Sequence, residues 1–290
     1  MSQTNFDLGE YHLQKGNLND AILRFKIASL LKPNNAYAYY NLGRSLYLKD
    51  QKIAAKDKFL FSLKLNSELK EAKYFLSVID EQYDIPEEIP LSIIKEYYNN
   101  IEYLPHNKSS DSIKFIIEKI VSLYFLNTKL SILELGIGDG NFGEELRIAN
   151  SEIEITGVDV AHSAIKNLNL NVKNKLTYNY LIEDDFYEYL RNNTLKFDVI
   201  VALNSLVYNK NLNQIISLIS KHLNSDSLFV FSSYKSNDET IKFDKSKQYF
   251  IYPTEYFQEI LSKHNISIIE LKNFQNESSV EEMVLICKLK

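Results

Sequence analysis

The 290-residue sequence is poor in residue types that define several protein classes: it has one cysteine, two methionines, five prolines, eight glycines and no tryptophan. The single cysteine, Cys287, excludes an internal disulfide and a zinc site built from several cysteines. Its apolar neighbours in VLICKL predict a buried strand residue. An excess of positive charge is also missing, since 33 basic residues face 38 acidic ones. Without a positive field, the chain is disfavoured as a dedicated binder of nucleic acid or anionic lipid.

Long apolar runs are absent too. No run approaches the roughly 20 apolar residues that span a bilayer, and the start, MSQTNFDLGEYHLQKG, lacks the apolar core of a secretory signal. We therefore predict a cytoplasmic protein with no membrane partner. The length predicts one or two domains with sizeable cores, and two is the working interpretation.

A repeat with an offset of 34 residues is present near the start of the chain. Small residues recur where two antiparallel helices must approach closely, and a phenylalanine recurs where the space between them must be filled. The pattern resembles the tetratricopeptide repeat (TPR) over residues 2–82, with two repeats followed by a capping helix at 70–82. The matching pairs are Leu8 and Leu42, Gly9 and Gly43, Ala21 and Ala55, Phe25 and Phe59, and Leu31 and Leu65.

The TPR resemblance implies a module that binds a protein partner. Fewer than three full repeats seldom bury enough surface to stand alone, so a helical cap that only stabilises the next domain is the alternative. Three positions depart from the pattern: His12 and Leu46 replace an aromatic residue, and Ser67 replaces a proline. We predict TPR-like repeats over 1–83, a linker and two helices over 84–129, and a catalytic domain over 130–290. The linker is expected at 84–90, and the helices at 91–103 and 111–126, with Asp111 as an N-cap.

From residue 130 the apolar pattern alternates between short β-rich runs and amphipathic stretches, as in successive βαβ units. This alternation predicts a doubly wound α/β sheet of Rossmann-like type. The connection over 272–281 has no helical pattern, so the last two strands should form an antiparallel hairpin at the sheet edge. The strands are expected at 130–135, 152–158, 176–181, 197–203, 227–233, 266–271 and 283–289, and the helices at 142–150, 163–170, 185–192, 212–223 and 254–264.

A glycine-rich turn follows the first of these strands, in ILELGIGDG over residues 132–140. Glycines at such a turn let a ligand approach the backbone, where side chains would block it. The run resembles motif I of the class I methyltransferases, which use S-adenosylmethionine (SAM). The resemblance implies a seven-stranded fold with one reversed strand. It also implies that Gly136, Gly138 and Gly140 line the methionine and ribose part of SAM, with Ile137 in the same turn, and that Glu134 meets its amino group directly or through water.

An acidic residue ends the next predicted strand, nineteen residues after Gly140. The carboxylate of Asp159, followed by Val160, is placed to accept hydrogen bonds from both ribose hydroxyls. Residues 138–143 also spell GxGxxG, so an NAD(P)-dependent oxidoreductase is an alternative. Glu134 and Gly136 favour the methyltransferase, because both fit its longer motif.

Two further segments extend the resemblance. In IEDDF, at 182–186, it implies that Asp185, or else Asp184, holds the adenine amino group while Phe186 packs on the ring; acidic residues at a helix start are also ordinary partners of the helix dipole. The segment KFDVIVALNSLVY, at 196–208, resembles motif IV, which brings Leu203 and Asn204 beside the cofactor. Nearly the whole chain resembles bacterial methyltransferases that carry TPR repeats before the catalytic domain.

We therefore predict a SAM-dependent methyltransferase acting on a small molecule or a protein side chain. Asn204, Asn209 and LNSD at 223–226 depart from the pattern of these relatives, so a non-catalytic scaffold with a degenerate domain is the alternative. No Asn/Asp-Pro-Pro-aromatic run is present, which disfavours planar amide and base-amine acceptors. No catalytic residue is assigned. The side chains considered as a general base are His106, His162, Tyr208 and Tyr249.

Overall fold

The chain forms two compact units in a computed structural model that describes residues 1–101, 110–124, 129–170, 177–275 and 281–290. The first unit is Met1–Ile94 and the second Lys95–Lys290. The division lies inside α6 (Leu91–Asn99), downstream of the segment 84–90 expected as a linker. Across the described ranges, no helix combines the length and apolar character needed to cross a membrane.

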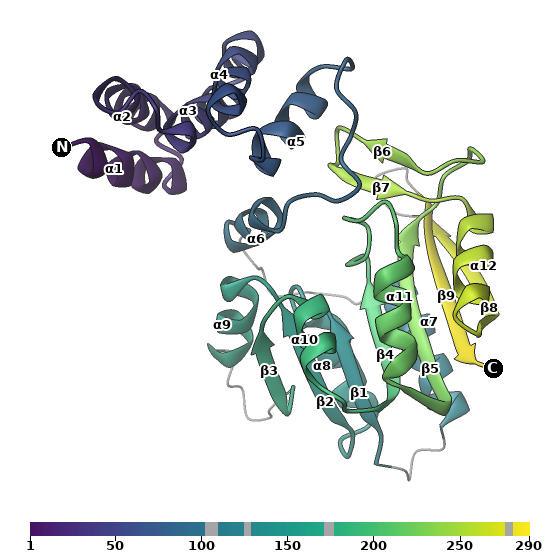
Figure 1. The fold of residues 1–290 in the computed structure, drawn as a ribbon. Coiled ribbons are helices and arrows are strands. Elements are labelled where there is room, and N and C mark those ends of the chain that lie inside the picture. The colour runs from purple at the N-terminus through teal and green to yellow at the C-terminus, as the bar shows by residue number, and fades with distance from the viewer. Residues whose placement is uncertain (102–109, 125–128, 171–176, 276–280) are drawn as a thin grey trace. The chain divides into compact units, whose positions relative to one another are not determined.

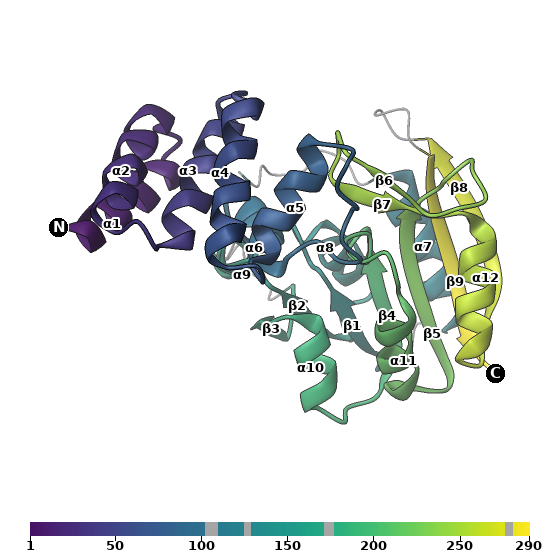
Figure 2. The same cartoon turned by 45° about the horizontal axis from the view of Figure 1, so that its top comes forward.

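The first unit is built from helices that follow one another through short turns (Figure 2). A Cβ added at Gly9 would lie 2.7 Å from the ring of Phe25, and one added at Gly43 would lie 2.9 Å from the ring of Phe59. The 34-residue repeat in the sequence is thus a repeat of one contact, in which glycine lets a phenylalanine from the next helix pack against the backbone. The helices are α1 (Ser2–Gln14), α2 (Leu18–Leu31), α3 (Ala36–Leu48), α4 (Lys52–Leu65) and α5 (Lys70–Ile79).

The second unit contains a seven-stranded sheet in the order β3-β2-β1-β4-β5-β9-β8. The ladders among β1 to β5 are parallel, whereas β9 runs antiparallel to both β5 and β8. The predicted sheet with one reversed strand is confirmed. Its strands are β1 (Ser131–Leu135), β2 (Glu154–Asp159), β3 (Tyr180–Glu183), β4 (Phe197–Leu203), β5 (Leu223–Tyr234), β8 (Ile266–Gln275) and β9 (Glu281–Leu289).

Helices cover both faces of this sheet, as Figure 1 shows. One face packs its alternate strand residues against α7 (Asp111–Leu123), α8 (Asn141–Ala149) and α9 (His162–Leu170), in a single buried apolar cluster. On the other face, Phe231 of β5 contacts Phe257 of α12 (Thr254–Lys263), their ring centroids 5.1 Å apart. Burial on both faces is why the central strands are almost continuous apolar runs. The remaining helices of this unit are α10 (Phe186–Asn192) and α11 (Asn213–Lys221).

Several expected boundaries differ from the structure: β5 begins at Leu223 instead of 227, β8 extends to Gln275, and α6 ends at Asn99. Two further differences have a visible side-chain cause. β3 begins at Tyr180, and the preceding Tyr178 turns its side chain into the core instead of continuing the strand. The N-cap of α7 is Ser110, whose hydroxyl accepts a hydrogen bond from the Ile113 amide at 3.3 Å, so the expectation of Asp111 as the cap is wrong. Asp111 instead lies in the first turn, where its charge complements the helix dipole.

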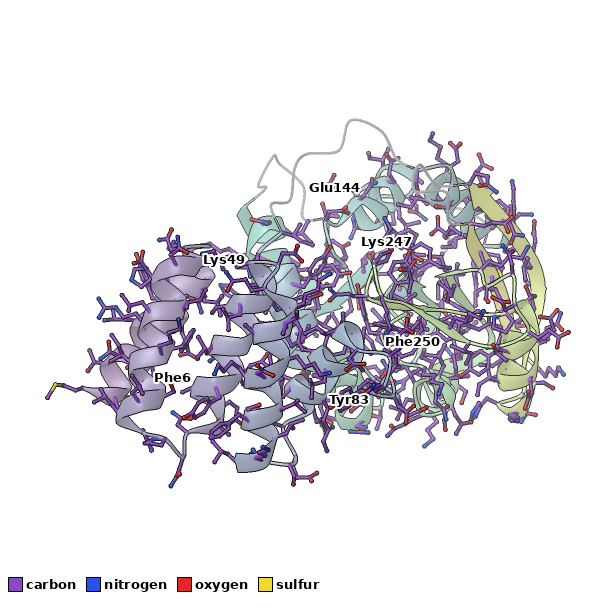
Figure 3. All side chains as sticks on the ribbon, turned by 90° about the horizontal axis from the view of Figure 1, so that it is seen from above. Phe6, Lys49, Tyr83, Glu144, Lys247 and Phe250 are labelled. Carbon is purple, nitrogen blue, oxygen red and sulfur yellow. The ribbon has the colours of Figure 1, made fainter. Side chains whose placement is uncertain are left out.

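A small hairpin was not predicted: β6 (Lys242–Asp244) and β7 (Tyr249–Ile251) pair after β5. It carries Lys247 and Phe250, both labelled in Figure 3. The amide of Phe250 donates to the carbonyl of Val207 at 2.8 Å, so the hairpin fixes the loop that follows β4. Its strands have three residues each, which is too short for a periodic sequence pattern.

Candidate active site

The glycine turn connects β1 to α8 and has an unusual backbone. Gly136, Gly138 and Gly140 have φ of 79°, 52° and 81°, a region that side chains disfavour. The Gly136 amide donates to the Val158 carbonyl at 2.8 Å, which ties the turn to the end of β2. A Cβ at Gly138 would meet no described atom within 4 Å, so the backbone there faces open space. This turn fits a ligand that lies against the main chain.

The same turn touches the segment after β4. A Cβ at Gly136 would lie 2.6 Å from the Cβ of Ser205, so only glycine permits this approach. The carboxyl ends of β1 and β4 are neighbours in the sheet, which is where parallel α/β folds bind ligands. Residues 136 and 205 thus mark one continuous site at this edge.

Asp159 lies beside the glycine turn at the end of β2. Its Oδ2 accepts a hydrogen bond from the Gly138 amide at 3.0 Å, and its Oδ1 accepts one from the Ala161 amide at 2.8 Å. Burial raises the pKa of Asp159, while hydrogen bonds from backbone amides act in the opposite direction. The carboxyl group therefore holds the turn in shape at the end of β2.

Glu134 is buried one position before the end of β1 and has a side-chain partner of its own. Its Oε2 accepts a hydrogen bond from the Tyr178 hydroxyl at 2.8 Å. Burial raises the pKa of Glu134 to about 8, against the lowering effect of the Tyr178 hydrogen bond. Tyr178 fits there because Gly143 and Gly157 leave room for its ring. No local sequence pattern marks this tyrosine as a partner of Glu134.

The acidic segment after β3 caps α10. Asp185 is its N-cap, and Oδ1 accepts a hydrogen bond from the Tyr187 amide at 3.2 Å. The Asp184 amide donates to the carbonyl of Asp159 at 3.1 Å, which places this segment next to the end of β2. Phe186 stacks on Tyr187, with ring centroids 5.4 Å apart. The capping role of Asp185 is the structural alternative weighed from the sequence.

Asn204 follows Leu203, the last residue of β4, and adopts a left-handed backbone with φ of 50°. Its amide N–H donates to Ser232 of β5, and its side-chain Nδ2 donates to Oε1 of Glu282 at 2.8 Å. Asn204 Oδ1 and Ser205 Oγ are both buried without a hydrogen-bond partner among the described residues. A buried acceptor left unsatisfied is costly, so this position favours a ligand that brings a donor.

Two pairs of tyrosine side chains lie near the carboxyl ends of β4 and β5. The hydroxyls of Tyr98 and Tyr208 lie within hydrogen-bond distance, and Tyr234 stacks on Tyr249 with ring centroids 4.3 Å apart. Burial raises the pKa of Tyr98, Tyr208, Tyr234 and Tyr249. These phenols therefore stay protonated near neutral pH, which argues against Tyr208 and Tyr249 as general bases.

The end of α6 is held near this edge through α9. The Ser163 amide donates to Oδ1 of Asn99 at 3.0 Å, and the Ser163 hydroxyl donates to the carbonyl of Tyr98 at 2.9 Å. Tyr98 also packs against the buried cluster of the sheet.

The two histidines considered as bases remain without a catalytic role. His162 is exposed, and its Nδ1 lies 2.8 Å from Oε2 of Glu183. His106 lies outside the described residues. Of the other sequence-selected residues, Ile137 turns its side chain into the core, leaving its backbone in the turn, and Val160 is partly exposed after β2. In the described ranges, no group of three or more His, Cys, Asp or Glu side chains is placed to hold a metal ion.

The structure brings the glycine turn, Asp159, the 184–186 segment and Asn204 to one edge of the sheet. Sequence reasoning missed Ser205 and Glu282. Glu282 lies 78 residues after Asn204 and reaches it through the pairing of β9 with β5. Only the sheet register brings these two residues together, and no local sequence pattern encodes that register.

Comparisons with known proteins agree with this geometry. The family described as "Methyltransferase domain" matches residues 126–275. The chain is 30% identical over 185 residues to the ubiquinone biosynthesis O-methyltransferase of Rickettsia typhi, covering 58% of this chain and 72% of that protein. It is 30% identical over 159 residues to the malonyl-[acyl-carrier protein] O-methyltransferase of Bacillus anthracis, covering 54% of this chain and 50% of that protein.

Among solved structures, magnesium protoporphyrin IX methyltransferase from Synechocystis with bound SAM superimposes with a TM-score of 0.54. Sequence identity is 13%, and the match covers 69% of this chain and 96% of that one. This likeness shows a shared fold.

The fold and the glycine-rich edge define a class I methyltransferase that uses SAM. The chain belongs to the methyltransferase-domain family.

Proposed function

We propose that the chain transfers the methyl group of SAM to an oxygen atom of a small molecule. The observation that carries the proposal is the similarity to two proteins named as O-methyltransferases, one of which the chain covers over 72% of its length. Bound SAM supplies an activated methyl group: the O–CH3 bond forms as the S–CH3 bond breaks, its electron pair stays on sulfur, and any acceptor proton passes to solvent.

The residues proposed to hold SAM are those that meet at the carboxyl edge of the sheet. Gly136, Gly138 and Gly140 present bare backbone, and Asp159 lies within hydrogen-bond distance of that turn. We assign Asp159 to the ribose, Glu134 to the amino group, and Asp185 with Phe186 to the adenine. Ile137, Val160, Asp184, Leu203 and Asn204 complete the proposed wall. These residues bind and orient the donor, and alignment of donor with acceptor supplies much of the rate.

The test uses the full chain with SAM labelled in its methyl group and an acceptor mixture that contains phenols, carboxylic acids and amines. In mild base a methyl ester releases labelled methanol, whereas an aryl ether and an N-methyl product both survive and are told apart by mass spectrometry of the isolated product. We expect the label in an ether or an ester. Replacing Asp159 by alanine should raise the KM for SAM about tenfold or more, because a hydrogen bond to a charged group is lost. Glu188→Gln, on the exposed side of α10, is the matched control.

Two results would contradict this proposal. Label confined to N-methyl products would exclude the oxygen acceptor. A well-folded chain that binds SAM and forms no product with any acceptor would instead support the non-catalytic scaffold.

We further propose that Met1–Ile94 is a TPR-like module that docks a partner or a substrate. It is supported by the Gly9–Phe25 contact, which recurs at Gly43–Phe59. Several large apolar side chains of this unit are exposed and therefore accessible to a partner. They include Tyr11, Leu30, Tyr37 and Ile53.

A further inference from the structure

Arg147, in the last turn of α8, uses its guanidinium group to hold one short segment of backbone. A guanidinium group has five N–H donors, and all five are used here. Two bonds reach the Thr177 carbonyl, at 3.2 and 3.1 Å, and one reaches Asn179 Oδ1 at 2.7 Å. The other two reach the carbonyls of Ser151 and Ile153, at 2.9 and 2.6 Å. Arg147 therefore fixes the segment before β3 against the segment before β2.

Tyr178 lies between the two residues that Arg147 holds before β3. The second of them, Asn179, is also bound to β2: its amide donates to the Ile155 carbonyl at 2.8 Å, and its Oδ1 accepts from the Ile155 amide at 2.9 Å. Because the backbone on both sides of Tyr178 is fixed, the direction of its side chain is fixed as well. That side chain points into the core, and Tyr178 is 3% exposed.

The Tyr178 ring packs beneath the glycine turn. It fills the space beside Gly143 of α8 and Gly157 of β2, where an added Cβ would lie 2.4 and 2.9 Å from it. Its hydroxyl donates to Glu134 Oε2 at 2.8 Å. One side chain thus contacts β1, β2 and α8, the three elements that the glycine turn connects. A displacement of Tyr178 would therefore displace the carboxyl group of Glu134.

The charge of Glu134 is felt at the glycine turn. Burial has the largest effect on the pKa of Glu134 and raises it to about 8, while the Tyr178 hydrogen bond lowers it. The charges of Asp139, in the turn, and of Asp159 raise it further, so the three carboxyl groups interact. An ionised Glu134 attracts a cation at this turn, and that attraction acts over several ångströms without direct contact.

We propose that Arg147 and Tyr178 are positioning residues for SAM: Arg147 fixes Tyr178, and Tyr178 holds the Glu134 carboxyl group in place and favours its ionised form for the ammonium group of the ligand. This inference rests on the proposed binding of SAM and on the assignment of Glu134 to its amino group. It adds to that site two residues that lie behind it.

The test compares two ligands on the full chain by calorimetry. S-adenosylhomocysteine carries the ammonium group, whereas 5′-methylthioadenosine keeps the adenine, ribose and sulfur and lacks that group. Tyr178→Phe keeps the ring and removes the hydroxyl. At pH 7 it should weaken the binding of S-adenosylhomocysteine about tenfold, because a hydrogen bond to a charged group is lost. The affinity for 5′-methylthioadenosine should not change. Tyr180→Phe is the matched control, because Tyr180 is 56% exposed, and it should change neither affinity.

The dependence of affinity on pH separates this role from a loss of structure. In the wild type, the affinity for S-adenosylhomocysteine should rise from pH 6 to pH 8 as Glu134 loses its proton. Removal of the Tyr178 hydroxyl should raise the pKa of Glu134, so the same rise in Tyr178→Phe should occur at higher pH. A general loss of structure would instead lower both affinities by the same factor at every pH.

Two variants test the contribution of Arg147. Arg147→Met keeps the length of the side chain and removes its five donors, whereas Arg147→Lys keeps three donors. The affinity for S-adenosylhomocysteine relative to 5′-methylthioadenosine should fall from the wild type to Arg147→Lys and again to Arg147→Met, by about tenfold in total. Arg191→Met is the matched control, because Arg191 pairs with Glu188 on the exposed side of α10 at 2.6 Å.

If Arg147→Met fails to fold, Arg147→Lys and Tyr178→Phe still decide the question. An unchanged ratio of the two affinities in folded Tyr178→Phe, or an unshifted pH dependence, would overturn the inference and leave the proposed SAM site intact. A wild-type chain that binds neither ligand would remove the proposed SAM site and the inference with it.

Discussion

Glu134 combines three properties that rarely occur together: complete burial, a carboxyl group and a single neutral side-chain partner. Burial raises its pKa to about 8, and the Tyr178 hydroxyl at 2.8 Å offsets only part of that effect. Near neutral pH the group is therefore mainly protonated in the protein. A positively charged group arriving beside it would favour the ionised form.

This raised pKa makes stability depend on pH. A carboxyl group whose pKa is higher in the folded state contributes stability below its unfolded pKa, near 4.5, and loses that contribution as the pH rises through about 8. The free energy of unfolding should therefore fall between pH 5 and pH 9 in the wild type. Glu134→Gln, which resembles the protonated form, should remove a few kcal/mol of that decline.

Urea unfolding at a series of pH values measures the effect, with Glu144→Gln as the control. Glu144 is exposed on α8 and is labelled in Figure 3. If the free energy of unfolding changed with pH in the same way in the wild type and in Glu134→Gln, the pKa of Glu134 would not be raised in the folded state, and the prediction would be wrong.

At the scale of the element, the repeated helical contact carries its own prediction. Gly43→Ala places a Cβ 2.9 Å from the ring of Phe59, which must shift, so the free energy of unfolding should fall by about 1–3 kcal/mol. Adding Phe59→Leu should recover part of this loss, because the smaller side chain leaves room. Chemical denaturation measures Gly43→Ala, Phe59→Leu and the double variant. Simple additivity of the two single changes would contradict the proposed clash.

The same variant addresses the proposed docking role. If the helical unit docks the acceptor, Gly43→Ala should raise the KM for that acceptor and leave the affinity for SAM unchanged. An unchanged KM would favour the alternative, a helical cap without a binding role.

Much of the element order could be predicted, because the apolar pattern of each strand is visible in its own residues. Strands β1, β2, β4, β5 and β9 are apolar runs buried on both faces, and their sequences show it directly. β3 was misplaced because Tyr178 looks like a strand residue but packs inward against Glu134. The hairpin β6–β7 was missed because KFD and YFI are too short for a periodic signal.

The candidate site likewise contains residues that could be predicted from the sequence and residues that could not. The glycine turn and Asp159 could be predicted because their spacing along the chain reflects one strand-turn-helix unit and the strand after it. Glu282 could not, since its place beside Asn204 follows from the register of two distant strands. The glycine turn and Asp159 are thus readable from local sequence, whereas the Asn204–Glu282 contact depends on tertiary pairing.

At the scale of the whole molecule, the division into two units predicts an uneven response to ligand. SAM at about 100 times its dissociation constant should stabilise the second unit by about 2.7 kcal/mol. Hydrogen exchange should slow at the glycine turn and at the ends of β2 and β4, while exchange in α1 to α5 should not change. Thermal unfolding with SAM, S-adenosylhomocysteine and NAD completes the measurement. A shift with NAD alone would contradict the assignment of the cofactor.

The position of β9 affects how the sheet can form during synthesis. β9 lies between β5 and β8, although residues 281–289 leave the ribosome after both neighbours. Until then, two strands rich in unpaired backbone groups stand open, a state prone to pairing with other chains. The gap between β5 and β8 therefore closes only when residues 281–289 are inserted as the last interior strand.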